Sequence, residues 1–190
     1  EQARGRLLEV RSQRIPPQLD DKQLLGWNAL MVEALCCAYA ATSEDQYRER
    51  AERTVAFLER CLSDGTQWYH TYKNGEARYP AFLDDLAWLI AAYLRLQEVT
   101  GNAAYLEKAR VLTGQVIEAF SEPETPYFFY TANNQTDVIV RKKEVYDGAT
   151  PSGNAVMAHN LYTLGMLYDR REWTQRSVEM VAGLRDAVEK

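Results

Sequence analysis

The stretch that decides the fold reads ATSEDQYRERA over residues 41–51, and it returns as VTGNAAYLEKA over residues 99–109. The threonine, tyrosine and alanine of the first copy recur at a constant offset of 58 residues. A third, looser copy follows 68 residues later, with Trp173 at the tyrosine position and Ser177 at the alanine. Each copy predicts a long helix, a short polar turn and a second helix. Because one such hairpin cannot bury its apolar face alone, the repeat predicts helical hairpins that stack on one another.

Composition places the chain among globular proteins and excludes two function classes. We expect its 190 residues to form a single domain, residues 1–190, in which 46% of the side chains are hydrophobic and 26% are charged. The formal net charge of −5 and the scatter of Lys and Arg argue against a nucleic-acid partner. The one basic cluster, Arg141-Lys142-Lys143, is followed at once by Glu144. No apolar run approaches the roughly 20 residues that a membrane-spanning helix needs, so no membrane partner is expected.

Cysteine and histidine usage indicates the compartment and argues against a metal. The three cysteines, Cys36, Cys37 and Cys61, form neither a disulfide framework nor a CxxC pair, which indicates a reducing, cytoplasmic location. The N-terminus lacks the charged-then-apolar pattern of a signal peptide. His70 and His159 are too few and too far apart in sequence for a zinc site. The sequence therefore predicts no metal and no cofactor.

Apolar periodicity and turn residues divide the chain into three hairpins, at about residues 20–63, 83–121 and 150–189. We expect Asp20 or Asp21 to cap the first long helix, Ser43 to cap the second, and Thr150 to cap the fifth. Lys73-Asn74-Gly75 predicts a tight β-hairpin turn in the first connector, and Asn133-Asn134 predicts a second extended hairpin between residues 127 and 140. The long connectors then all lie at the end where the odd-numbered helices begin.

Acidic residues recur at that end: Asp20-Asp21, Asp84-Asp85 and Asp147. One interpretation is structural, because aspartate caps helices and stabilises their N-termini. The other is chemical, because carboxylates gathered on one rim suit acid/base work on a sugar ring. In a doublet, one Asp can cap while its neighbour faces the pocket.

Aromatic and polar residues near the helix starts are candidates for ligand contact, although the aromatic rings also suit gaps between hairpins. In the segment 147–154, Gly153 removes a side chain where a ligand or a neighbouring helix approaches closely. His159 is interpreted as a packed or surface residue. The candidate binding residues are Trp27, Asn28, Tyr69, Trp88, Asp147, Ser152 and Asn154.

Three blocks carry a resemblance to a known family: RSQRIPPQLDDKQLLGWNALM at 11–31, FLDDLA at 82–87 and DGATPSGNAV at 147–156. In this order they resemble the bacterial thioredoxin-domain-containing proteins related to the spermatogenesis-associated thioredoxin-like protein. That resemblance implies an all-α fold, an (α/α)6 toroid of six hairpins similar to N-acylglucosamine 2-epimerases and six-hairpin glycosidases, preceded by a thioredoxin-like domain. This chain carries three hairpins with short β-hairpin connectors and no CxxC. It is therefore expected to be the C-terminal half of the toroid, with the N-terminal half and the thioredoxin-like domain as partners in the full-length protein.

The sequence is compatible with three functions. In the first, the complete protein binds a carbohydrate-like small molecule and epimerises or hydrolyses it, with Asp84 or Asp85 as acid/base and Asp21 as a second carboxylate. The half alone is then expected to be inactive, and its open flanks predict self-association or dependence on the missing half. In the alternative, the toroid is a non-catalytic scaffold that docks partners for the redox domain. A tetratricopeptide-like peptide binder would require superhelical stacking.

Overall fold

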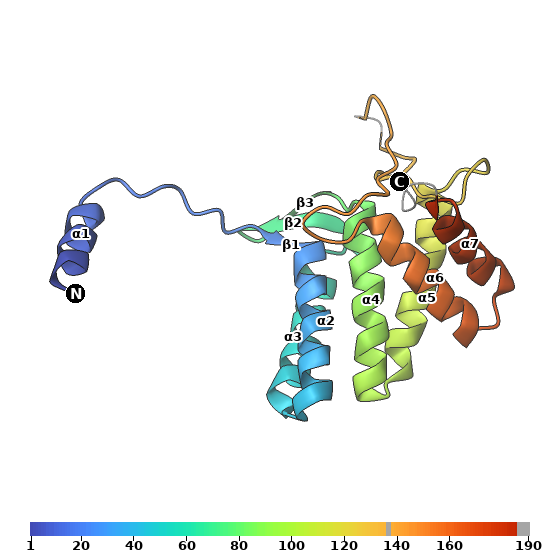
Figure 1. Cartoon of the computed structure of the whole chain (residues 1–190), viewed down its shortest axis with the longest axis horizontal. Coiled ribbons are helices and arrows are strands. Elements are labelled where there is room, and N and C mark those ends of the chain that lie inside the picture. Colours follow the sequence, from blue (N-terminus) through green and yellow to red (C-terminus); the bar gives the residue numbers. More distant parts are fainter. Residues whose placement is uncertain (136–137, 186–190) are drawn as a thin grey trace.

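A computed structural model describes residues 1–135 and 138–185. Three helical hairpins stand side by side, and their first helices all begin at the end that carries the connectors (Figure 1). The central helix α4 packs against α2 on one side and α6 on the other. The elements in order are α1 (Gln2–Ser12), β1 (Gln23–Leu24), α2 (Leu25–Thr42), α3 (Asp45–Cys61), β2 (Tyr69–Lys73), β3 (Glu76–Pro80), α4 (Leu83–Thr100), α5 (Ala103–Phe120), α6 (Gly153–Leu167) and α7 (Arg171–Ala182). The predicted stack of three hairpins is confirmed.

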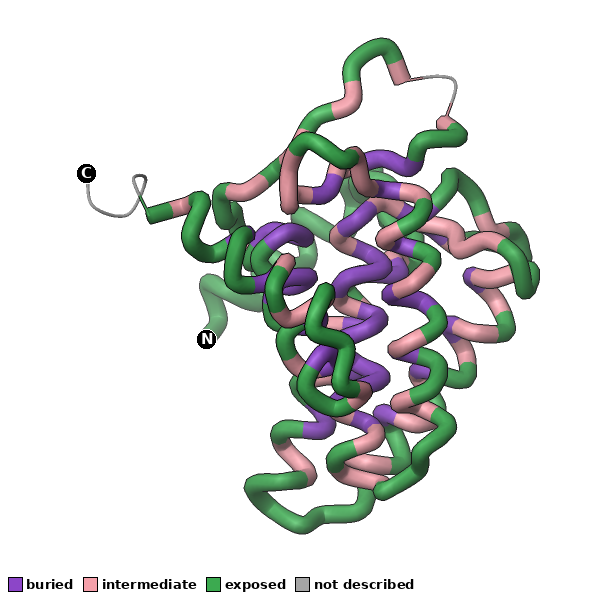
Figure 2. The backbone as a smooth tube through the Cα atoms, turned by 90° about the vertical axis from the view of Figure 1, so that its right-hand side faces the viewer, coloured by how far each residue is buried: buried purple, intermediate pink, exposed green. Residues whose placement is uncertain are grey.

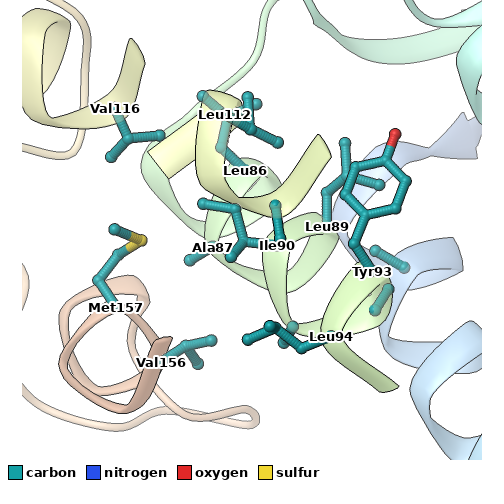
Figure 3. Packing of buried hydrophobic residues seen from close by; sticks show 14 of the residues in the cluster. Leu86, Ala87, Leu89, Ile90, Tyr93, Leu94, Leu112, Val116, Val156 and Met157 are labelled. Atoms are coloured by element: carbon teal, nitrogen blue, oxygen red, sulfur yellow. The ribbon is translucent and has the colours of Figure 1, made fainter. Parts of the chain in front are cut away.

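The core lies inside this stack, where buried stretches of the chain run between exposed outer turns (Figure 2). Helix α4 is apolar nearly all round, as expected for a helix enclosed by neighbours. Leu86 and Ile90 of α4 meet Leu112 of α5 and Met157 of α6 (Figure 3). Burying each such side chain stabilises the fold by roughly 1.5–3 kcal/mol.

The repeated threonine explains why two hairpins turn in the same way. The hydroxyls of Thr42 and Thr100 donate to the carbonyl four residues earlier and accept the backbone N–H two residues later. The next residues, Ser43 and Gly101, adopt left-handed conformations with φ of 59° and 69°. Ser43 therefore ends α2 rather than capping α3, so its predicted role as an N-cap is wrong.

The first connector forms the predicted β-hairpin. Strands β1, β2 and β3 make an antiparallel sheet in that order. Asn74 and Gly75 both have positive φ, 53° and 83°, as a two-residue type I′ turn requires. Because β1 pairs with β2, the chain stays extended up to Leu24. The cap predicted at Asp20 or Asp21 is therefore wrong, and α2 begins without a side-chain cap of its own.

The second connector differs from the prediction. Its described residues, 121–135 and 138–152, form no strand, and one backbone hydrogen bond, from Tyr130 N to Lys142 O, crosses it. The N–H and C=O of Phe128, which a strand partner would use, bond instead to the side chain of Asn154. The cap predicted at Thr150 is also wrong, because Ser152 precedes α6 and accepts the N–H of Ala155.

Outside the hairpins, α1 stands apart from the rest of the chain (Figure 1), and every one of its residues is exposed. No helix in the described residues is long and apolar enough to cross a membrane.

Candidate functional site

Asp85, in the first turn of α4, joins three elements at the connector end. Its Oδ1 accepts the N–H of Gly26 in α2 at 2.9 Å, and its Oδ2 accepts the N–H of Phe82 at 3.0 Å. The same Oδ2 lies 2.8 Å from Nδ1 of His70 on β2. The residue is only 3% exposed. A buried carboxylate with these three contacts is suited to hold the three elements together.

His70 is oriented by that carboxylate. Because the Asp85 carboxylate already accepts two backbone N–H groups, the third contact is best satisfied by a proton on Nδ1 of His70, which leaves Nε2 available. The hydrogen bond to Asp85 raises the pKa of His70 above its ordinary value, against the effect of burial. The ring also meets Phe82 edge-on, with centroids 5.0 Å apart. His70 is thus a titratable group held in one orientation.

Asp84, the neighbouring residue, points to the other side of α4. Its Oδ1 accepts the N–H of Gly153, the first residue of α6, at 3.2 Å. Burial, helped by the negative charges of Glu144 and Asp85, raises the pKa of Asp84 to about 6. A carboxyl with this pKa is able both to donate and to accept a proton near neutral pH, as acid/base catalysis requires.

Two glycines make room for these carboxylates. A Cβ on Gly26 would lie 2.9 Å from Oδ1 of Asp85, and a Cβ on Gly153 would lie 2.5 Å from Oδ1 of Asp84. The close approach expected at Gly153 is therefore that of a neighbouring helix. The doublet on α4 binds the starts of both flanking helices, which brings the openings of α2, α4 and α6 together.

Tyr130 completes the cluster from the second connector. Its ring stacks on Phe82 with centroids 4.8 Å apart and an interplanar angle of 15°, and its carbonyl accepts the N–H of Leu83. Burial first, and then the charges of Asp84, Asp85 and Glu144, raise the pKa of its phenol. We name His70, Phe82, Asp84, Asp85 and Tyr130 the rim cluster.

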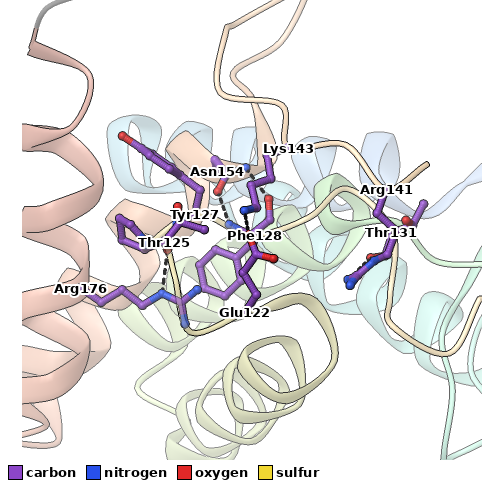
Figure 4. Close-up of polar contacts among 10 residues, drawn as sticks. Glu122, Thr125, Tyr127, Phe128, Thr131, Arg141, Lys143, Asn154 and Arg176 are labelled. Atoms are coloured by element: carbon purple, nitrogen blue, oxygen red, sulfur yellow. Dashed lines mark hydrogen bonds and ion pairs between the residues drawn. The ribbon is translucent and has the colours of Figure 1, made fainter.

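Asn154 fixes the second connector in place above α6 (Figure 4). Its Oδ1 accepts the N–H of Phe128 at 2.8 Å, and its Nδ2 donates to the carbonyls of Phe128 and Glu144 at 3.0 and 2.8 Å. Arg176 of α7 lies 3.8 Å from the Phe128 ring and donates from Nε to Pro126 O. Burial lowers the pKa of Arg176 to about 10. The connector that carries Tyr130 is thus held by side chains of α6 and α7.

Several of the candidate residues form hydrogen bonds or ion pairs within the protein. Asn154 has its amide fully engaged, and Asp147 accepts the N–H of Ser152 at 2.9 Å. Ser152 itself caps α6. Asp21 is exposed and paired with Lys73 of the hairpin at 2.5 Å, which lowers the pKa of Asp21. These residues shape the walls around the rim cluster or lie on the hairpin beside it.

The remaining candidates lie on the helices and the first connector. Trp27 is 71% exposed on α2, and Asn28 donates its amide to Leu24 O. Tyr69 donates its hydroxyl to Asp64 at 2.7 Å, which raises the pKa of Tyr69. The backbone N–H of Gln67, followed by this hydroxyl, lowers the pKa of Asp64. Trp88 is half-buried against the core, one turn beyond Asp84. Sequence reasoning missed His70 and Tyr130, because only the tertiary fold brings them to α4.

Within residues 1–135 and 138–185, no group of three or more His, Cys, Asp or Glu side chains is arranged to hold a metal ion.

Comparison with solved structures identifies the fold class of the chain. The chain matches a sugar epimerase from a ruminal bacterium with a TM-score of 0.73 and 14% identity, over 88% of this chain and 46% of that one. A GH76 alpha-mannanase from Bacteroides thetaiotaomicron gives 0.67 and 16%, over 90% and 45%. The unsaturated glucuronyl hydrolase of Bacillus sp. GL1 gives 0.66 and 20%, over 92% and 50%. The chain therefore has the fold of about half of an (α/α)6 toroid.

Comparison with known sequences finds homologous proteins. Spermatogenesis-associated protein 20 of Mus musculus is 30% identical over 184 residues, which is 91% of this chain and 23% of that protein. The uncharacterized protein B0495.5 of Caenorhabditis elegans is 30% identical over 191 residues, 96% of this chain and 26% of that one. No family model matches. The chain is a homologue of spermatogenesis-associated protein 20, as the resemblance predicts, and spans about a quarter of the length of these relatives.

Proposed function

We propose that the complete protein binds a carbohydrate-like ligand at the rim cluster and that Asp84 exchanges a proton with it. The observation that supports this most directly is the half-buried Asp84 carboxyl, whose pKa is raised to about 6 where three helices begin. The fold is shared with proteins named as a sugar epimerase, a mannanase and a glucuronyl hydrolase. This shared fold supports a carbohydrate as the class of ligand.

The roles within the rim cluster follow from hydrogen-bond geometry. Asp84 has one oxygen on the N–H of Gly153, which leaves the other for a ligand hydroxyl, a glycosidic oxygen or a carbon-bound hydrogen. His70 presents Nε2 as a second group for proton transfer, and Asp85 is the positioning residue that orients it. Epimerisation and glycoside hydrolysis are both reactions in which such a pair can act. Because Asp21 is paired with Lys73, we assign the second role to His70 in its place.

The chain supplies one part of the site in this proposal. Residues 1–190 would form the C-terminal half of the toroid, and the other half, with a thioredoxin-like domain before it, would complete the wall. The exposed apolar side chains on the two flanks support this: Trp27 and Met31 on α2, and Tyr162 and Met166 on α6. We expect the half alone to be inactive and either to self-associate through these flanks or to depend on the remainder for stability.

Calorimetry of the intact parent protein with monosaccharides and oligosaccharides tests the ligand class. In the parent, Asp84→Asn should keep binding but lower turnover of an accepted sugar by about 10²–10⁴-fold, the usual contribution of a positioned acid or base. Glu98→Gln, at the far end of α4, is the matched control and should change neither. No binding heat across the panel, or full turnover by Asp84→Asn, would favour the scaffold alternative.

A further inference from the structure

A hollow lies away from the catalytic candidates. It has a volume of about 310 Å³ and is bounded by α5, by the first connector at Trp68 and by the second connector at Asn133. Leu86 of α4 contributes to it, whereas Asp84 and His70 do not line it. A hollow of this size is at the lower end of the range for small-molecule sites, large enough for one sugar ring.

The floor of the hollow is apolar and firmly packed. It is formed by buried side chains of the core, which are Ala81, Leu86, Leu112, Phe120 and Ala132. Trp68 forms one wall and is half-buried against that core. Its backbone is held by pairing with Ser63 and by the hydrogen bond from Ala81 N to Trp68 O at 2.9 Å. The indole is partly packed against the core and offers an aromatic surface on which a ring can stack.

The lip of the hollow is polar but almost uncharged. Gln67, Gln115 and Asn134 line it, and among the described residues no hydrogen bond involves their side-chain carboxamides. Glu118 is the one charged side chain among the lining residues that the structure describes. Without a cationic side chain, this lip does not favour an anion. Free amide donors and acceptors instead match hydroxyl groups.

We propose that this hollow, bounded by Trp68, Gln115 and Asn134, binds a neutral carbohydrate ring as a site separate from the rim cluster. The apolar face of a sugar ring would stack on the Trp68 indole, and its hydroxyls would bond the carboxamides of Gln115 and Asn134. An anionic sugar is disfavoured, because its carboxylate would meet Glu118 and no compensating cation. The site does not depend on the proposed chemistry at Asp84.

Titration with methyl β-D-glucopyranoside and cellobiose, followed by NMR of the Trp68 indole N–H and the Gln115 side-chain amide, tests this site in the folded chain. We expect saturable shifts with millimolar affinity, and affinity about tenfold weaker, equal to about 1.4 kcal/mol, in Trp68→Ala and in Gln115→Ala. Gln115 is exposed, so its variant keeps the fold intact. Glucuronate should bind more weakly than the neutral glucoside.

Two controls separate this site from the rim cluster. Trp27→Ala removes another exposed indole, and Asp84→Asn alters the rim; neither should change the shifts at Trp68. Absence of saturable shifts, or equal affinity in wild type, Trp68→Ala and Gln115→Ala, would overturn the proposal. Tighter binding of glucuronate, or preferential binding of adenosine, would overturn the ligand class. None of these four outcomes bears on the proposal for Asp84, which is tested separately.

Discussion

Replacing Gly153 by alanine tests the convergence of helix starts. In an unobstructed helix, alanine in place of glycine stabilises the folded state by about 0.5–1 kcal/mol. At Gly153 the added Cβ would lie 2.5 Å from Oδ1 of Asp84, 3.0 Å from Cγ of Leu83 and 3.1 Å from the backbone N of Asp84. The carboxylate can rotate away, but the backbone of α4 cannot move without disturbing the core.

The expected magnitude follows from two costs and one gain. Overpacking of this kind costs about 1–3 kcal/mol. Displacing the Asp84 carboxylate removes its hydrogen bond from Gly153 N, a loss of about 1 kcal/mol. The better helix propensity of alanine offsets up to about 1 kcal/mol. Gly153→Ala should therefore destabilise the fold by about 1–3 kcal/mol.

Thermal and urea unfolding of two variants measure this effect. Gly114 lies inside α5, and a Cβ added there would have no atom within 4 Å, so Gly114→Ala is the matched control and should be stabilised. For a chain of this size, Gly153→Ala should lower Tm by about 3–10 °C, while Gly114→Ala should raise it slightly. If Gly153→Ala unfolds at or above the Tm of Gly114→Ala, the contact between Asp84 and α6 is wrong.

Three further variants probe the rim and its supports. Asp84→Asn should flatten the pH dependence of stability: with its folded pKa near 6 and an unfolded value near 4, the wild-type carboxyl contributes stability that is present below about pH 4 and lost as pH rises to about 6. Equal slopes of Tm against pH in both proteins would contradict this. Asp85→Asn should cost about 2–4 kcal/mol in urea unfolding, because the amide group that replaces one carboxylate oxygen cannot accept the hydrogen bonds made to that oxygen. The same variant should lower the pKa of His70 in an NMR titration, and an unchanged His70 titration would refute the pairing. Asn154→Ala should cost a similar 2–4 kcal/mol by leaving connector backbone groups unpaired, whereas the exposed Asn134→Ala should stay within about 0.5 kcal/mol of wild type; equal unfolding midpoints would show that the connector is held otherwise.

The hairpins were predictable because their signals are local. The hydroxyl of the repeated threonine donates to the last turn of one helix and accepts the backbone N–H just before the next helix. The offset of 58 residues therefore corresponds directly to a structural unit. The turn at Asn74-Gly75 is likewise a local matter of positive φ. Helix N-termini were less predictable. Asp85 caps the start of α2 from 59 residues away, and no pattern near Gly26 indicates that partner.

The site was predictable in part for the same reason. A carboxylate doublet at a helix start is visible in sequence, and the doublet itself suggests that one member caps while the other faces a pocket. Which member does which depends on burial: Asp85 is enclosed by three donors, whereas Asp84 is left with one. His70 and Tyr130 approach α4 from two different connectors. Their positions next to α4 depend on how the hairpins pack together, so no local sequence pattern predicts them.

The proton-transfer role assigned to the first carboxyl of the doublet is tested most directly by site-resolved ¹³C NMR titration of Asp84. We predict that Asp84 titrates with a midpoint near pH 6 and that this midpoint shifts when a sugar binds to the intact parent protein. A midpoint near 4, the ordinary value for a solvated aspartate, would contradict the account.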